Sequence, residues 1–198
     1  GALFVILSAV LFGTMPLLTK TAYAYGGNTY TVAFGRFVFG TVTVGLIVAL
    51  SPKLSFRITG RDLRQLLAVS FFTAVTPLLL YGSYRYMDSG LATTLHFTYP
   101  VSVMALGALF FHRRLQRRQL LCLLICLAGV ACFYRPGQTA DGKGMAIAVL
   151  SGVTFALYIL VLGRSDLGRL PMLTLSFWIS LFCSAGIGAF SALTGNLH

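Results

Sequence analysis

The segment that decides the fold is Ser89–Tyr134, with the sequence SGLATTLHFTYPVSVMALGALFFHRRLQRRQLLCLLICLAGVACFY. It contains an apolar stretch with His96 and Pro100 near its middle, a basic connection HRRLQRR, and a second apolar stretch. A helix rises about 1.5 Å per residue, so roughly 20 apolar residues cross a hydrocarbon core of about 30 Å. The segment therefore predicts a membrane hairpin with a polar position inside its first arm.

The composition extends this prediction to the whole chain. Of the 198 residues, 57% are hydrophobic and 10% are charged, whereas soluble domains are about 25% charged. The net charge of +11 comes from Lys and Arg placed between apolar stretches. That placement follows the positive-inside rule and does not form a basic face for nucleic acid. We therefore predict an all-α integral membrane protein whose partner is the lipid bilayer, with no nucleic-acid partner.

Apolar stretches long enough to be membrane helices occur at about 2–24, 29–50, 65–86, 90–111, 119–134, 144–163 and 172–193. The second, fourth and sixth connections together hold ten Lys and Arg residues, and the first, third and fifth hold four. The positive-inside rule then predicts a multi-pass protein of the cell (inner) membrane with a cytoplasmic N-terminus.

An internal repeat indicates how the helices are organised. Shifting the chain by 143 residues aligns the first two apolar stretches with the last two and gives twelve identities, Gly1/Gly144, Leu7/Leu150, Ser8/Ser151, Val10/Val153, Phe12/Phe155, Leu17/Leu160, Thr31/Thr174, Phe34/Phe177, Phe39/Phe182, Gly45/Gly188, Ala49/Ala192 and Leu50/Leu193. The repeat predicts a five-helix unit over 1–135 and the first two helices of a second unit over 144–198. An odd number of crossings inverts the second unit, and inverted repeats are typical of secondary transporters with a substrate site at the repeat interface.

The repeat also predicts a larger whole. Seven helices would be present of a probable ten, and both ends of the ten-helix protein would be cytoplasmic. The apolar stretch begins at Gly1 without an initiator Met, which we interpret as a piece of a longer chain. For this piece alone we expect either poor stability or association into a homodimer.

Four segments resemble a known family: SAVLFGTMPLLTK at 8–20, FGRFVFG at 34–40, the stretch from 84 to 130, and GKGMAIAVLSGVTFALYIL at 142–160. They are similar to the EamA-type transporters of the drug/metabolite transporter superfamily. The most specific part is the order Ala92, Tyr99-Pro100, basic hairpin, Gly129. The resemblance implies an exporter of a small organic metabolite, such as an amino acid, that works by alternating access. Arg113 stands where the family usually carries a Glu.

Arg36 is the charge most indicative of function, because it lies inside the second apolar stretch with no charged neighbour there. An Arg at the centre of a membrane helix costs roughly 2.5–3.5 kcal/mol on insertion scales, so it should face a cavity or a partner. It could anchor a substrate carboxylate or phosphate. It could equally be a structural residue that reaches the interface or binds backbone carbonyls.

His96, Tyr99 and Pro100 share one helix face by their i, i+3 and i+4 spacing. Pro100 has no N–H to offer the carbonyl of His96, so the group predicts a bent helix with a polar lining. His96 would then line the substrate pathway and could carry a proton, or it could simply bond a neighbouring helix.

Four further residues are candidate substrate contacts, again with packing as the alternative: Thr14 beside Pro16, Tyr81 one turn after Pro77, and the aromatic residues Tyr158 and Trp178 of the second unit. Catalytic motifs are missing from the sequence. It has no Gly-rich phosphate loop followed by Lys, no HExxH and no CxxC, so we predict no enzyme, no cofactor and no metal. The rival interpretations are a membrane enzyme acting on a lipid-linked substrate and a non-transporting accessory subunit.

Overall fold

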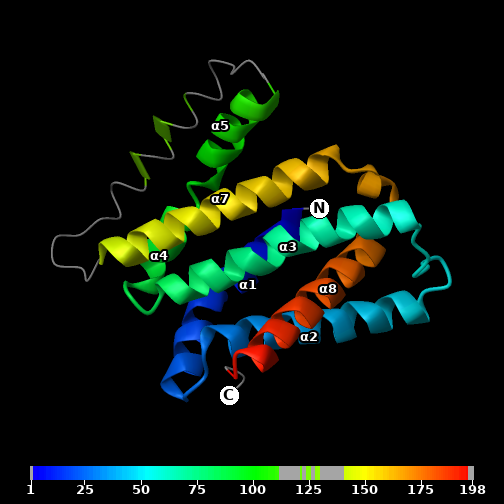
Figure 1. The fold of residues 1–198 in the computed structure, drawn as a ribbon, viewed down its shortest axis with the longest axis horizontal. Coiled ribbons are helices and arrows are strands. Elements are labelled where there is room, and N and C mark those ends of the chain that lie inside the picture. Colours follow the sequence, from blue (N-terminus) through cyan, green and yellow to red (C-terminus); the bar gives the residue numbers. More distant parts are fainter. Residues whose placement is uncertain (1, 112–120, 122–123, 126–127, 130–140, 196–198) are drawn as a thin grey trace.

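The structure is a computed structural model that describes residues 2–111, 121, 124–125, 128–129 and 141–195. Every element in this part is helical (Figure 1). In chain order the elements are α1 (Ala2–Ala24), α2 (Thr29–Leu50), α3 (Gly60–Ser83), α4 (Ser89–His96), α5 (Tyr99–Phe111), α7 (Gly142–Arg164), the short 3₁₀ helix η1 (Asp166–Arg169) and α8 (Met172–Leu193).

The predicted all-helical class is confirmed, but the count of seven helices out of ten is not. The structure describes helices for six of the seven predicted stretches. Most of the fifth stretch, 119–134, lies outside the described residues. Arg113 also lies outside them. Four described helices, α2, α3, α7 and α8, are long and apolar enough to cross a membrane.

The third helix begins five residues earlier than predicted, at Gly60 instead of 65. The reason is a capping box: the Thr59 hydroxyl accepts from the Asp62 backbone N–H at 3.3 Å, and the Asp62 carboxylate accepts from the Thr59 N–H at 2.9 Å. Such a box satisfies backbone donors that the start of a helix leaves free. A polar first turn therefore extends the helix beyond its apolar stretch.

The fourth predicted stretch, 90–111, is one segment in sequence but two helices in the structure. α4 ends at His96 and α5 begins at Tyr99, because Pro100 cannot donate to the carbonyl of His96. That carbonyl instead lies against α7, where a Cβ added to Gly152 would be 3.0 Å from it. The predicted bend is thus a complete interruption of the helix, and α7 packs closely against it.

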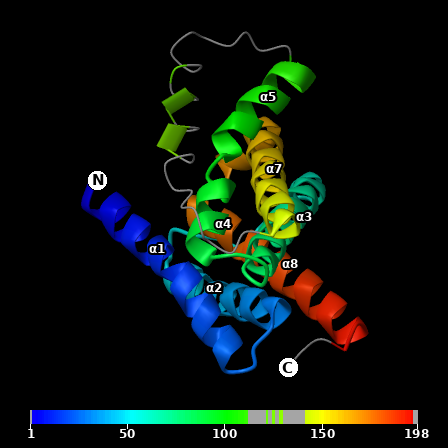
Figure 2. The ribbon, with the colours of Figure 1, turned by 90° about the vertical axis from the view of Figure 1, so that its left-hand side faces the viewer.

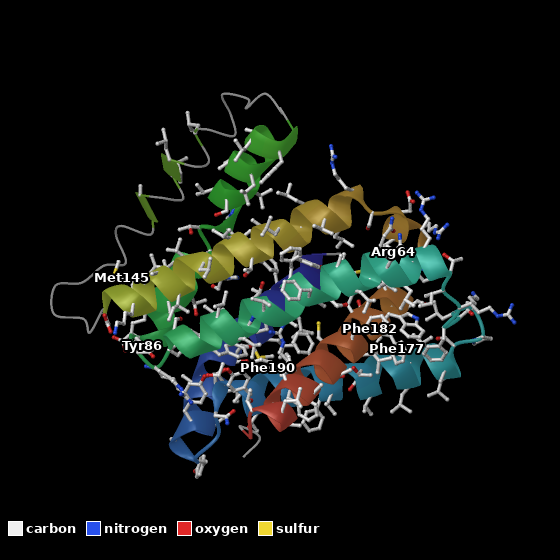
Figure 3. The ribbon with its side chains drawn as sticks, viewed as in Figure 1. Arg64, Tyr86, Met145, Phe177, Phe182 and Phe190 are labelled. Carbon is white, nitrogen blue, oxygen red and sulfur yellow. The ribbon has the colours of Figure 1, made fainter. Side chains whose placement is uncertain are left out.

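The described connections, between α1 and α2, α2 and α3, α3 and α4, and α7 and α8, lie at two opposite ends of the molecule (Figure 1). Figure 3 shows Tyr86 and Met145 at one end and Arg64 at the other. α7 packs on α3, α4 and α5, while α8 packs on α2 and α3. α5 extends away from α1, α2 and α8 (Figure 2). We call the two ends the Tyr86 end and the Arg64 end.

The outer surface is apolar, as expected for helices in a bilayer. Large hydrophobic side chains are strongly exposed, including Leu17 at 73%, Phe39 at 75% and Leu50 at 82%. The interior includes small and apolar residues such as Ala33, Val69 and Ala92, each 0% exposed. Exposed apolar surface on this scale marks contact with lipid or with further protein.

The contact between α2 and α8 is reciprocal. A Cβ on Gly188 would lie 2.8 Å from Cε2 of Phe34, and a Cβ on Gly45 would lie 3.0 Å from Cε2 of Phe177. Phe34 and Phe177 are repeat partners under the shift of 143 residues, and so are Gly45 and Gly188. Reciprocal contact of equivalent residues is the mark of two-fold symmetry.

Gly188→Val should therefore destabilise the α2–α8 contact. The new side chain would overlap the Phe34 ring, and overpacking costs about 1–3 kcal/mol. We expect a lower melting temperature in detergent, partly restored by adding Phe34→Ala. Gly186→Val is the matched control, since a Cβ there meets nothing within 4 Å. Equal destabilisation by both valines would contradict this contact.

Candidate functional site

A cavity of about 120 Å³ lies between α1, α2, α3, α4 and α7. Its polar lining residues come from three helices of the first predicted unit: Arg36, Thr73, Thr76, Tyr81, Tyr84, Thr93 and His96. Its apolar lining is formed by Met15, Pro16, Phe37, Pro77, Leu80 and Phe155. A concave site with a few convergent polar groups in apolar walls is the usual form of a small-molecule site.

α3 supplies the largest share of the lining, and its proline contributes a backbone acceptor. Pro77 lies inside the helix and has no N–H for the carbonyl of Thr73. Both residues line the cavity. Pro77 thus removes one backbone hydrogen bond from α3. The hydroxyl of the neighbouring Thr76 stays paired, because it donates to the Phe72 carbonyl of the same helix at 2.8 Å.

Arg36 lies in this cavity with a neutral partner. Its Nη1 donates to the hydroxyl oxygen of Tyr81 at 3.0 Å. Tyr81 therefore acts as acceptor to Arg36, and its own O–H proton can be donated to another group. The two residues together place a guanidinium and a phenol donor side by side at the cavity wall.

The chain has four acidic residues, and none of them pairs with Arg36 in the part that the structure describes. Asp62 pairs with Arg169, Asp88 with Lys20 and Asp166 with Arg61. Asp141 accepts from the Lys143 N–H at the start of α7. The described cavity lining therefore contains one cation and no carboxylate.

His96 is 3% exposed and fixed by α7. Its Nδ1 lies 2.9 Å from the Ser151 hydroxyl, and that hydroxyl donates its one proton to the Ala148 carbonyl at 2.6 Å. Since a hydroxyl has one proton, Nδ1–H must be the donor to Ser151. In the neutral ring Nε2 is then an acceptor.

The other predicted site residues lie outside this lining. Tyr99 and Tyr158 pack behind the cavity against Phe155, with ring centroids 4.7 Å and 5.4 Å from it. Thr14 is exposed and bonds the Leu11 carbonyl of its own helix at 2.8 Å. Trp178 is on α8 and donates from Nε1 to the Phe56 carbonyl at 3.1 Å. The structure thus brings together Arg36, Tyr81 and His96, which come from three different helices.

The cavity lining also includes four residues that were not among the predicted substrate contacts: Thr73, Thr76, Tyr84 and Thr93. A signal for the first three was present, because positions 73, 76, 80 and 84 recur at the three- to four-residue spacing of one helix face. Thr93 is on α4 and does not belong to this face. It is hydrogen-bonded to Tyr84, whose hydroxyl lies 2.9 Å from the Thr93 Oγ1. That pairing depends on how α3 and α4 meet.

Long apolar helices, alternating connections and a polar cavity among them define a multi-pass helical membrane protein. The model of the EamA-like transporter family matches residues 1–135. The chain belongs to this family.

Two curated relatives agree with that membership. One from Archaeoglobus fulgidus, described as an uncharacterized transporter, is 27% identical over 146 residues, which are 73% of this chain and 51% of the relative. One from Bacillus subtilis, also described as an uncharacterized transporter, is 23% identical over 189 residues, 92% of this chain and 58% of the relative. The chain spans a little over half the length of these relatives.

Proposed function

We propose that this protein is a secondary transporter of the inner membrane that exports a small organic metabolite, such as an amino acid, by alternating access. The observation that carries the proposal is the cavity around Arg36. Its guanidinium has no carboxylate partner among the described residues and lies beside the Tyr81 hydroxyl at 3.0 Å. A substrate carboxylate would complete the site, because Arg binds carboxylates through paired N–H donors.

The size of the cavity constrains which part of the substrate it holds. Its volume of about 120 Å³ is smaller than the roughly 300–1,000 Å³ of typical ligand sites. It accommodates an anionic head group between Arg36 and the His96 and Phe155 side chains that line the same cavity, and the remainder of a metabolite would extend beyond this lining. We place the substrate carboxylate at the donors of Arg36 and Tyr81.

Two inverted units provide the mechanism. The family match over 1–135 and the reciprocal Phe–Gly contacts of α2 and α8 support a second unit that begins at α7. Rocking of the two units about this contact would expose the cavity to each side of the membrane in turn. The distribution of Lys and Arg supports a cytoplasmic N-terminus, which would put the Arg64 end on the cytoplasmic side.

Flux through purified full-length protein in liposomes tests the proposal. We expect saturable movement of at least one member of a panel of radiolabelled amino acids and small organic acids, with no chemical change. A changed product would indicate an enzyme acting on its substrate. Neither flux nor product across the panel, from protein shown to be folded, would indicate an accessory subunit.

A further inference from the structure

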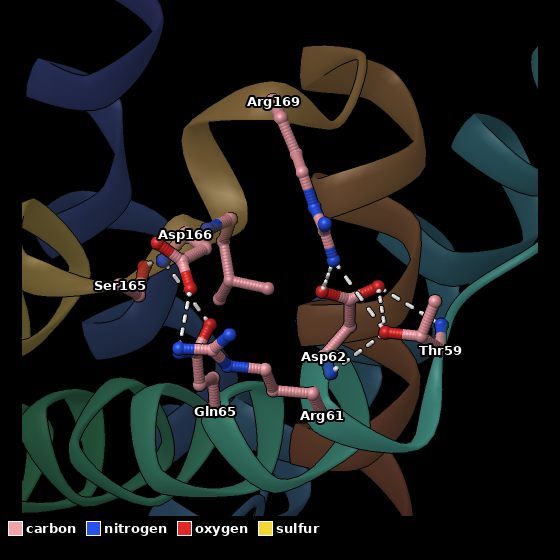
Figure 4. Close-up of polar contacts among 8 residues, drawn as sticks. Thr59, Arg61, Asp62, Gln65, Ser165, Asp166 and Arg169 are labelled. Atoms are coloured by element: carbon pink, nitrogen blue, oxygen red, sulfur yellow. Dashed lines mark hydrogen bonds and ion pairs between the residues drawn. The ribbon is translucent and has the colours of Figure 1, made fainter.

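We propose that Asp62 and Arg169 form a latch that closes the Arg64 end of the transport path and separates when the cavity opens to that side. The proposal rests on alternating access as the proposed function. The latch identifies the contact that holds the Arg64 end closed in that function. Figure 4 shows the contacts that surround this pair.

The carboxylate of the latch is shielded from solvent. The Asp62 side chain is 1% exposed and forms an ion pair with Arg169, whose side chain is 54% exposed. The same carboxylate accepts from the Thr59 N–H at 2.9 Å and from the Thr59 hydroxyl at 2.7 Å. A buried carboxylate loses its hydration, so removing its cation leaves an uncompensated charge. Arg169 therefore adds to the stabilisation that the two Thr59 hydrogen bonds give the Asp62 charge, and its loss leaves the shielded carboxylate without a cation.

The latch joins parts of the chain that move against each other in an alternating-access cycle. Asp62 belongs to α3 of the first unit, and Arg169 belongs to η1, which connects α7 and α8 of the second. Leu66, one turn after Asp62 on α3, and Leu167, two residues before Arg169 in η1, are both 0% exposed and belong to one hydrophobic cluster. The ion pair thus joins two segments that also share an apolar core.

Hydrogen bonds from α8 hold the same end. The Thr174 hydroxyl of α8 donates to the Ser55 carbonyl at 3.0 Å, and Trp178 Nε1 donates to the Phe56 carbonyl at 3.1 Å. Both connect the second unit to the chain that links α2 and α3. Opening at the Arg64 end must break these contacts together with the ion pair, so the closed state at this end is a cooperative arrangement.

The structure also contains ion pairs that should not act as latches. Arg61 and Asp166 lie 3.1 Å apart between the same two segments, but their side chains are 77% and 51% exposed. At the Tyr86 end, Lys20 and Asp88 are 3.4 Å apart and 44% and 49% exposed, and both belong to the first unit. Exposed pairs contribute little because water and salt screen them. Among the described ion pairs, Asp62–Arg169 alone joins the units through a buried carboxylate.

The latch is separate from the substrate site. At 1.5 Å per residue, Thr73 of the cavity lies about 16 Å along α3 from Asp62. Loss of the latch should therefore change which side reaches the cavity and should not remove a group that touches substrate. This separation allows the two roles to be measured independently.

The test measures access to a cysteine placed at Thr73 in full-length protein whose native cysteines are replaced. A membrane-impermeant methanethiosulfonate is applied to each side in turn, using inside-out and right-side-out vesicles without substrate. Arg169→Gln removes the cation and leaves the Thr59–Asp62 capping box intact. We expect it to raise the labelling rate from the Arg64 end about tenfold by shifting the population toward the state open there.

Arg61→Gln is the matched control, because it removes one Arg charge from the same end and breaks only the exposed pair. Its labelling rate should stay within about twofold of the parent protein. If Arg169→Gln is poorly folded, Asp62→Asn removes the buried charge while its side-chain oxygen can still accept from Thr59, and the same tenfold rise is expected.

The outcomes separate the latch from the mechanism on which it rests. An unchanged rate in both latch variants, or an equal rise in Arg61→Gln, overturns the latch while leaving alternating access intact. If the cysteine in the parent protein is labelled from one side only, both without substrate and with every member of the panel, the failure is that of the proposed function.

Discussion

Replacing Arg36 with leucine is expected to abolish flux of an anionic substrate while leaving membrane insertion intact. Arg36 is the charged member of the described cavity lining, and its guanidinium donates to Tyr81 at 3.0 Å. A hydrogen bond to a charged group contributes about 1.5–3 kcal/mol, so losing a two-point contact should lower flux at least about 100-fold. Initial rates in liposomes measure the change.

Two variants distinguish a substrate contact from a structural role for Arg36. Tyr81→Phe removes the neighbouring hydroxyl and should raise KM about tenfold with little change in maximal flux. Arg36→Lys keeps the charge but loses the planar pair of donors, so its flux should be intermediate. Normal flux in Arg36→Leu, or a loss explained by lower protein in the membrane, would remove Arg36 from the site.

Gly152→Val is expected to destabilise the packing of α7 on the interruption between α4 and α5. A Cβ on Gly152 would lie 3.0 Å from the His96 carbonyl oxygen and 3.6 Å from the Tyr99 backbone nitrogen. These are backbone atoms at the interruption between α4 and α5, so no rotamer change can relieve the overlap. Overpacking of this kind costs about 1–3 kcal/mol and sometimes more.

The measurement is thermal unfolding in detergent, followed by the loss of monodisperse protein. Gly163→Val is the matched control on the same helix, because a Cβ there meets nothing within 4 Å. We expect Gly152→Val to lower the melting temperature by several degrees more than Gly163→Val. The same shift in both would mean that α7 does not pack closely on the interruption.

Much of the helical framework could be predicted from the sequence. Boundaries at Thr29–Leu50 and Met172–Leu193 agree with the predicted stretches residue by residue, because each apolar stretch ends where polar or turn-forming residues begin. The start of α3 could not be placed by hydropathy, since Thr59 and Asp62 stabilise it by capping. The interruption after His96 was predicted only as a bend.

The candidate site was less predictable, for a geometric reason. A sequence gives the position of a residue along a helix, but the direction in which it points depends on neighbouring helices. Arg36, Tyr81 and His96 face one cavity, whereas Thr14 and Trp178, chosen on similar grounds, do not. Tyr81 and Arg36 are 45 residues apart, and no local pattern relates them.

The sequence by itself determined a helical membrane protein, the approximate position of its long helices and a repeat at 143 residues, because hydropathy and helix length are properties of local stretches. Only the tertiary structure decided which polar groups share a cavity and which acidic residue is buried. Asp62 and Arg169 are 107 residues apart and lie in connections that look alike in charge. Their pairing depends on how α3 packs against α7 and α8, since burial is a property of the assembled helices.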